Sequence, residues 1–266
     1  MTLYKVTSEI FTENKNSFVT LNNGKHYTST KLQHVGLQVW RGALLLADYI
    51  LSNPDLFKNK TVLELGAGVG LTSIVASFLA KEVICTEPLM KLAALLVKRW
   101  ENNSTRTWLT PESLNNVDVE GILRLIRRNF LRNNDYVRSR IYVKELDFLN
   151  VTWPTFYEKR MKEATIILAA DVIYDENITE GFVQTLKKLL NSEVPKVVYI
   201  ALEKRYVFTT ANMDTTAPMY EEFLKRIETE KQNWHIEYIK IDFPRYFKYD
   251  RLKQMILMKI ENKLSD

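Results

Sequence analysis

Residues 61–71, TVLELGAGVGL, restrict the possible folds of this chain more than any other segment. A β-branched, apolar run ends there in an acid, Glu64, and is followed by Gly66, Gly68 and Gly70. The pattern predicts a buried strand that runs into a glycine-rich turn and then a helix. Such a turn brings bare backbone next to a ligand.

The spacing of these glycines distinguishes the turn from the two common phosphate-binding loops. The dinucleotide fingerprint is G-x-G-x-x-G and the P-loop needs G-x-x-x-x-G-K-[ST]. This chain has G-x-G-x-G and no lysine after Gly70. A tight glycine turn preceded by an acid suits a ligand with an amine, a carboxylate and a nucleoside. S-adenosylmethionine carries all three groups and is the cofactor that we expect. Glu64 either accepts hydrogen bonds from its ammonium group or organises the loop.

Segments typical of strands and helices alternate along the rest of the chain. Buried, β-branched strands between helices predict an α/β fold, with a mostly parallel, Rossmann-like sheet covered on both faces. Only a short loop separates the last two strands, so we expect that pair to be antiparallel. The expected strands are 61–65, 83–86, 141–146, 164–170, 196–202, 235–243 and 254–260, and the expected helices are 36–51, 71–80, 118–133, 176–190 and 219–231.

Length and composition predict one globular domain with a sizeable core. The chain has 266 residues, of which 46% are hydrophobic and 26% charged. We expect an N-terminal arm over residues 1–35, with a hairpin turn at Asn23–Gly24, and the main domain over residues 36–262. The longest apolar run, 42–51, is broken by Asp48 and is too short to span a bilayer. The N-terminus has no apolar signal core, so we expect an intracellular protein.

Charge and metal-ligating residues give weaker indications. The single cysteine, Cys85, is expected in the core, and three scattered histidines predict no metal site. The net charge of +5 fits an acidic or nucleic-acid-associated partner about as well as ordinary solubility. A basic cluster is more often a solvated face than a binding patch; here it comprises Arg124, Arg127, Arg128, Arg132, Arg138 and Arg140.

Several ordered motifs together resemble the family-16 seven-strand methyltransferases, which are mainly protein-lysine methyltransferases. The motifs are VGLQVW at 35–40, ELGAGVGL at 64–71, VICTE at 83–87, ELDF at 145–148 and ADVIYD at 170–175. Phe148 departs from the tryptophan usual at its position. The resemblance implies a seven-strand methyltransferase fold and transfer of methyl from S-adenosylmethionine to a lysine of a non-histone protein. For one subgroup, which the C-terminal features match, it also implies nuclear residence.

Two acids compete for the ribose of the cofactor. A carboxylate at the end of the second strand can accept both ribose hydroxyls, and Glu87 stands there. The family pattern, however, runs from Cys-Thr directly into an Asp and a helix. Without residues 87–117, Asp118 would take that place. The extra segment is either a genuine insertion or a gene-model artefact, and the sequence leaves both acids as candidates.

The remaining motif residues are expected at the adenine and reaction ends of the site. Asp147 is a candidate acceptor for the adenine amine, with Phe148 against the base. Trp40 either closes over the cofactor or fastens the early helix to the sheet. Ala170 ends a buried strand beside the cofactor. Beyond that strand, Asp171 and Tyr174 are expected to orient the target amine and stabilise its developing charge.

Two other function classes stay open. A nucleic-acid methyltransferase is disfavoured, because ADVIYD lacks the Asn/Asp-Pro-Pro-aromatic motif of amino-methylating enzymes. A binding module that holds the cofactor without turnover is the second alternative, because the extra segment lies beside the ribose site. The expected partner is a protein substrate bearing the lysine, and the sequence leaves open whether that substrate is associated with nucleic acid. We expect a monomer without a membrane anchor.

Overall fold

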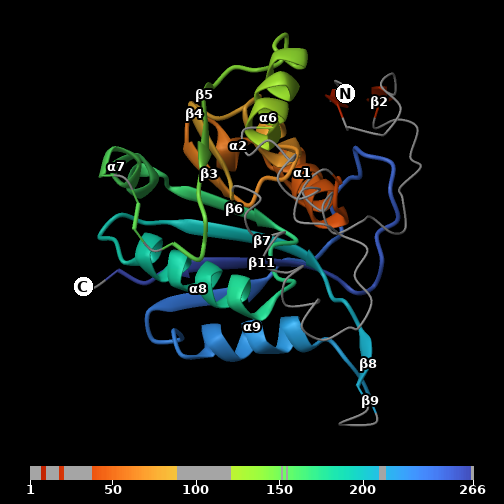
Figure 1. Ribbon diagram of the computed structural model, residues 1–266, viewed down its shortest axis with the longest axis vertical. Coiled ribbons are helices and arrows are strands. Elements are labelled where there is room, and N and C mark those ends of the chain that lie inside the picture. Colours follow the sequence, from red (N-terminus) through yellow and green to blue (C-terminus); the bar gives the residue numbers. More distant parts are fainter. Residues whose placement is uncertain are drawn as a thin grey trace, which may run out of the picture.

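A seven-stranded sheet forms the centre of the computed structural model, which describes residues 7–9, 18–20, 38–88, 121–150, 152–153, 155–209 and 214–264 (Figure 1). The strand order is β10-β11-β7-β6-β3-β4-β5. The bounds are Thr61–Leu65 for β3, Glu82–Glu87 for β4, Arg140–Glu145 for β5, Ile166–Ala170 for β6, Val197–Glu203 for β7, Trp234–Tyr238 for β10 and Met255–Asn262 for β11.

The strand directions confirm the expected fold class. β7, β6, β3, β4 and β5 pair in parallel, whereas β11 pairs antiparallel with both β7 and β10. The central strand β6, with the sequence IILAA, is buried at every position. A strand covered on both faces has no polar side, which explains its unbroken apolar run.

Helices cover both faces of this sheet. One face carries α1 (Arg41–Ser52), α3 (Leu71–Ala76) and α6 (Gly121–Arg132), and the other carries α7 (Thr155–Glu163), α8 (Glu176–Leu190) and α9 (Pro218–Glu228). Figure 1 shows α8 and α9 side by side beneath the sheet. Because successive strand residues face opposite sides, alternate residues such as Val62 and Leu63 enter the two different cores.

Some expected element bounds were wrong. α1 begins at Arg41, because Trp40 before it has an extended backbone. β10 ends at Tyr238, five residues before the expected end of that strand. The sequence analysis also missed the short helix α2 (Pro54–Phe57), α7, and a hairpin of β8 (Val207–Thr209) and β9 (Asp214–Thr216).

The N-terminal arm is described only in part. β2 (Phe18–Thr20) pairs antiparallel with β1 (Thr7–Glu9), which precedes it in the chain. The expected turn at Asn23–Gly24 lies outside the described residues, as does most of the extra segment at 87–117. Within the described part of the chain, every helix is too short or too polar to cross a membrane.

Asp48, which interrupts the apolar run of α1, is a fully buried hydrogen-bond acceptor. Its Oδ1 accepts the backbone N–H groups of Tyr246 and Phe247 at 2.7 and 3.2 Å. Its Oδ2 accepts the Tyr249 hydroxyl and the Arg251 guanidinium, both at 2.8 Å. These donors lie in the loop between β10 and β11, so the buried carboxylate fastens that loop to α1. The chain leaves β10 early to make these contacts.

Replacing Tyr249 with phenylalanine tests this network. The change removes one of the four donors to a buried carboxylate, and a hydrogen bond to a charged group is worth about 1.5–3 kcal/mol. We therefore expect the free energy of unfolding to fall by about that amount in urea denaturation. Tyr206→Phe, at a position 53% exposed, is the control and should leave the midpoint unchanged. Equal midpoints for both variants would contradict the proposed role of the hydroxyl.

Candidate functional site

A cleft opens at the carboxyl ends of the parallel strands and encloses about 540 Å³, part of it open to solvent. Open α/β sheets bind their ligands at this edge. Nine of the residues singled out from the sequence line it: Trp40, Gly66, Gly68, Glu87, Asp147, Phe148, Ala170, Asp171 and Tyr174. Four further residues that the sequence analysis did not single out complete the lining: Pro88, Leu149, Val172 and Ile178.

The glycine turn needs its glycines for two separate physical reasons. Gly66, Gly68 and Gly70 all have positive φ, at 72°, 55° and 85°. L-residues with a side chain rarely adopt this backbone region. At Gly66 a Cβ atom would also lie 2.7 Å from Val172 Cγ1. The turn can therefore pack against the loop that follows β6 only with glycine at this position.

Glu64 stabilises the start of α3 and does not line the cleft. Its Oε2 accepts the backbone N–H of Ser73 at 2.9 Å and also the Ser73 hydroxyl. The residue before α3, Gly70, has no side chain to cap the helix, so the strand-end acid supplies the cap. Burial raises the pKa of Glu64 to about 7. Of the two roles left open by the sequence, the geometry matches organisation of the loop.

Glu87 ends β4 on the wall of the cleft. Its Oε2 accepts the backbone N–H of Gly68 at 2.8 Å, and no described residue donates to Oε1. Desolvation of the carboxyl raises its pKa to about 8; the Gly68 hydrogen bond lowers it in part, and the charge of Glu64 raises it further. The competing acid, Asp118, lies outside the described residues. The structure therefore places one of the two candidate acids in the cleft and leaves the comparison between them open.

Asp171 joins three elements at the other end of the cleft. Its Oδ2 accepts the backbone N–H of Gly42 in α1 at 2.6 Å, and its Oδ1 accepts that of Glu203 in β7 at 3.0 Å. A Cβ atom at Gly42 would lie 2.6 Å from Oδ2, so this approach requires glycine. Burial raises the pKa of Asp171. Because backbone N–H groups hold both oxygens, the carboxylate positions the cleft wall.

Aromatic and cationic side chains surround this end of the cleft. Arg205 lies over the Trp40 ring, with its guanidinium carbon 4.6 Å from the ring centroid. Arg41 pairs with Glu203 at 3.0 Å. Tyr174 is partly buried, and desolvation raises the pKa of its hydroxyl, so the group is a neutral hydroxyl at physiological pH. Trp40 thus stands between the start of α1 and the mouth of the cleft.

The opposite end of the cleft is held by a close helix contact. Phe148 packs against Phe182 of α8, with ring centroids 5.5 Å apart. Asp147 accepts the N–H of Leu149 at 2.9 Å, which stabilises the turn after β5. A Cβ atom at Gly181 of α8 would lie only 2.4 Å from the Phe148 carbonyl oxygen. The sequence analysis did not identify Gly181, which reads as an ordinary helix residue.

Gly181→Ala should therefore displace the Phe148 backbone. Alanine gains about 1 kcal/mol of helix propensity over glycine. Contact with a backbone carbonyl leaves little room for relaxation, so we expect a net loss of about 1–3 kcal/mol in stability. Urea denaturation measures that loss, and calorimetry with S-adenosylmethionine should show weaker binding. Gln184→Ala, at an exposed position one turn later, should leave both quantities unchanged. A stabilised Gly181→Ala variant with unaltered affinity would contradict the proposed packing role.

Comparison with known families agrees with this geometry. The model of the lysine methyltransferase family matches residues 24–115 and 104–230. The chain belongs to the lysine methyltransferase family. The two matched segments overlap within the segment that the sequence analysis treated as extra.

Curated members of this family match most of the chain. Methyltransferase-like protein 22 of Mus musculus is 33% identical over 243 residues, covering 89% of this chain and 58% of the mouse protein. The Homo sapiens protein of the same name is 32% identical over 89% of this chain and 56% of its own length. Protein-lysine N-methyltransferase EEF2KMT of Mus musculus is 24% identical over 85% of this chain and 58% of its own length. The chain thus spans less than two thirds of the length of these relatives.

The family and the fold imply the use of S-adenosylmethionine, and the cleft fits that cofactor. The cleft lies at the sheet edge where open α/β sheets bind their ligands. Its lining offers a carboxylate at Glu87, an aromatic ring at Phe148 and bare backbone at Gly66 and Gly68. These groups match two vicinal hydroxyls, a base and an amino-acid portion. Among the described residues no group of histidine, cysteine or acidic side chains could hold a metal ion.

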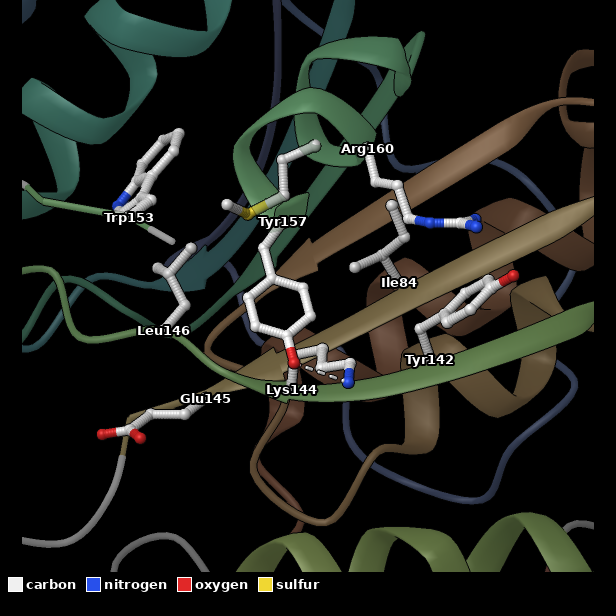
Figure 2. Close-up of a pocket in the computed structure, with 9 residues that line it drawn as sticks. Ile84, Tyr142, Lys144, Glu145, Leu146, Trp153, Tyr157 and Arg160 are labelled. Atoms are coloured by element: carbon white, nitrogen blue, oxygen red, sulfur yellow. Dashed lines mark hydrogen bonds between the residues drawn. The ribbon is translucent and has the colours of Figure 1, made fainter. Parts of the chain in front are cut away.

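A second, separate hollow of about 410 Å³ lies between α7 and strands β4 and β5 (Figure 2). Figure 2 shows Tyr142 and Lys144 rising from β5 toward Tyr157 and Arg160 of α7. Lys144 donates to the Tyr157 hydroxyl at 2.9 Å, and Arg160 pairs with Glu82 at 3.2 Å. None of the residues singled out as candidate site residues lines this hollow.

Proposed function

We propose that this chain transfers methyl from S-adenosylmethionine to a lysine side chain of a non-histone protein. The observation that carries the proposal is the convergence of the glycine turn, Glu87 and the ADVIYD loop on one cleft in a member of the lysine methyltransferase family. Bound in this cleft, the cofactor would supply an electrophilic methyl group on a sulfonium.

The cofactor roles follow the lining of the cleft. Glu87 accepts the ribose hydroxyls through its carboxylate, while its bond to Gly68 holds the turn in place. Phe148 packs on the adenine, and Asp147 accepts its amine. The backbone at Gly66 and Gly68 lets the amino-acid portion approach. Asp118 remains an alternative ribose acid within this proposal.

The reaction end needs alignment of the amine more than acid–base chemistry. Asp171 acts there as a positioning residue, because its bonds to Gly42 and Glu203 fix the start of α1 and the end of β7. Trp40 and Tyr174 supply the aromatic walls past which a lysine side chain enters, and aromatic faces stabilise its developing positive charge. The lysine must lose its proton before transfer, and an apolar entrance favours the neutral amine.

Two measurements test the proposal. Calorimetry of the chain with S-adenosylmethionine should show binding. Tritium-labelled cofactor should then transfer label to lysate proteins, in a form resistant to nuclease and released as methyl-lysine on hydrolysis. Binding without label would identify a module without turnover. Label that survives protease but not nuclease would identify a nucleic-acid methyltransferase.

The proposal includes a monomeric protein in the nucleus. Light scattering on the purified chain tests the first point, and microscopy of the tagged chain tests the second. A dimer that exchanges site residues, or exclusion from the nucleus, would contradict these parts without affecting the chemistry.

A further inference from the structure

Two cations follow β7 at the reaction end of the cleft. They are Lys204, which is half-buried, and Arg205, which is exposed, and we call them the entrance cations. The guanidinium of Arg205 lies over the ring of Trp40, a residue that lines the cleft. The entrance cations therefore stand beside the aromatic wall past which the proposed function brings the target lysine.

The acidic side chains at this end of the cleft already have partners. Glu203 accepts the guanidinium of Arg41 through Oε2 at 3.0 Å and the side-chain amide of Gln254 through Oε1 at 3.2 Å. Both carboxylate oxygens of Asp171 accept backbone N–H groups. Neither entrance cation forms an ion pair with a residue that the structure describes. The charge of Arg41 is thus compensated by Glu203, whereas the two charges of the entrance cations are not.

Each entrance cation is held against an aromatic ring. The guanidinium carbon of Arg205 lies 4.6 Å from the centroid of Trp40, and Nζ of Lys204 lies 4.7 Å from that of Tyr220. The hydroxyl of Tyr220 is itself hydrogen-bonded to that of Tyr238, at 2.9 Å. Aromatic faces attract cations and hold them in place without removing their charge. A guanidinium over a ring keeps the N–H donors at its edge for a planar acceptor such as a carboxylate.

The entrance cations also act on the charge of an approaching lysine. Burial raises the pKa of Asp171 and of Tyr174 on the cleft wall, and the charge of Arg205 opposes that rise in both. The field of Arg205 therefore reaches the reaction end. Since like charges nearby disfavour a second positive charge, a protonated lysine is repelled there unless its own chain supplies negative charge. Once the lysine is seated, the same field favours the neutral amine that transfer requires.

Exposed apolar surface continues from the entrance cations into the start of β8. Tyr206 and Val207 are 53% and 47% exposed. Figure 1 shows the β8–β9 hairpin projecting from the body of the molecule. An extended substrate segment that lies across the entrance would therefore meet two cations and, next to them, two apolar side chains.

We propose that the entrance cations select substrates in which acidic residues flank the target lysine. This inference rests on the proposed function, because it assigns a substrate class to the same site. An extended chain advances about 3.3 Å per residue, so the flanking acids lie within about three positions of the lysine. A carboxylate there meets the donor edge of Arg205 and offsets the repulsion of the lysine. Nucleic acid is a poorer match, because its binding depends on many phosphate contacts and the entrance offers two cations.

The test uses three fluorescein-labelled peptides, each with one lysine in a Gly-Ser background. Two glutamates, two glutamines or two arginines flank the lysine on each side. S-adenosylhomocysteine is present, so that no methyl is transferred. By fluorescence anisotropy, the unmodified chain should bind the glutamate peptide about tenfold more tightly than the glutamine peptide, and the arginine peptide most weakly.

Variants of the entrance cations should reduce this preference. R205Q should lower the ratio of the two dissociation constants from about tenfold to about two- or threefold. R205K should give an intermediate ratio, because it keeps the charge and loses the planar fork. K204Q is a second, independent variant, which leaves the contact between Arg205 and Trp40 in place and should lower the ratio to about fivefold.

The matched control is K159Q, which removes the same charge from an exposed lysine of α7 that does not line the cleft. It should keep the ratio of the unmodified chain. An unchanged ratio in R205Q and K204Q, an equal loss in K159Q, or no measurable binding of any peptide up to about 1 mM would each overturn the proposal. Displacement of the glutamate peptide by a lower concentration of a single-stranded oligonucleotide would also overturn it and would indicate a phosphate ligand.

Transfer of tritium-labelled methyl to the same peptides and to lysate proteins separates this inference from the proposed function. We expect kcat/KM to be about tenfold higher for the glutamate peptide than for the glutamine peptide, and R205Q to remove most of that difference. Selective binding that R205Q abolishes, with no label in any peptide or lysate protein, would contradict the proposed function and support the acid-binding surface. Label that does not depend on the flanking charge would contradict this inference and support methyl transfer.

Discussion

Replacing Asp171 with alanine should lower the free energy of unfolding by about 3–6 kcal/mol, because two hydrogen bonds to a buried carboxylate are lost. Methyl transfer should fall about a hundredfold or more, since a displacement of about 1 Å at a reaction site has effects of that size. The N–H groups of Gly42 and Glu203 would lose their acceptor, and the start of α1 would move. Urea denaturation and transfer of labelled methyl to lysate proteins measure the two losses.

Asp175 provides a matched control in the same motif. It too accepts two backbone N–H groups, from Asn177 and Ile178, but it caps α8 at the surface. Asp175→Ala should cost about 1 kcal/mol and leave transfer largely intact. At temperatures where both variants are folded, Asp171→Ala should keep most of its affinity for the cofactor. Equal loss of affinity and transfer in that variant would contradict the assignment of Asp171 to the reaction end.

The second large effect is a dependence of cofactor affinity on pH, set by Glu87. With its pKa raised to about 8, the free protein holds Glu87 mostly protonated at neutral pH. The ionised carboxylate accepts two ribose hydroxyls better than the acid does, so binding favours the ionised form and releases a proton. Cofactor affinity should therefore rise about tenfold per pH unit as the pH increases toward about 8, and level off above that pH. Calorimetry in buffers of different ionisation enthalpy measures the released proton directly.

Glu87→Gln should weaken cofactor binding about ten- to a hundredfold at high pH and abolish the pH dependence. Glutamine can still accept the N–H of Gly68, so the turn is kept. Glu145→Gln is the control, because Glu145 is the exposed neighbour of Glu87 in the β4–β5 register. If the Glu87→Gln variant retained both the cofactor affinity and its pH dependence, that result would contradict the role of Glu87 and favour Asp118 as the acid that binds the ribose.

Regular elements with a strong pattern were predictable from the sequence. α8 has the bounds that its periodicity predicts, residues 176–190, and a cap at Asp175. β6 is a buried apolar run and was expected within one or two residues of its observed start. α7 was missed because its sequence, TFYEKRMKE, has few apolar residues to mark a buried face. The end of β10 was missed because a distant residue, Asp48, draws the following loop away from the sheet.

The sequence predicted which residues form the candidate site better than it predicted the role of each residue. Motif positions after successive parallel strands must meet at one sheet edge, so their convergence follows from topology. The hydrogen-bond partners do not follow from it. Glu64 accepts a hydrogen bond from Ser73 of α3, nine positions later, and Asp171 accepts one from Gly42, 129 positions earlier. The packing glycines, Gly42 and Gly181, carry no local signal, because each is explained only by the backbone or side chain that approaches it.

The ion pair between Asp48 and Arg251 joins residues 203 positions apart, which has a consequence for how the chain folds. Contacts of such high sequence separation raise the contact order, which slows folding. During synthesis α1 leaves the ribosome long before its partners in the loop ahead of β11. In the nascent chain, α1 therefore lacks these final contacts until the loop ahead of β11 emerges. We expect a cofactor-competent cleft to form only after β11 has been synthesised, and chaperones to be needed most in the interval before that.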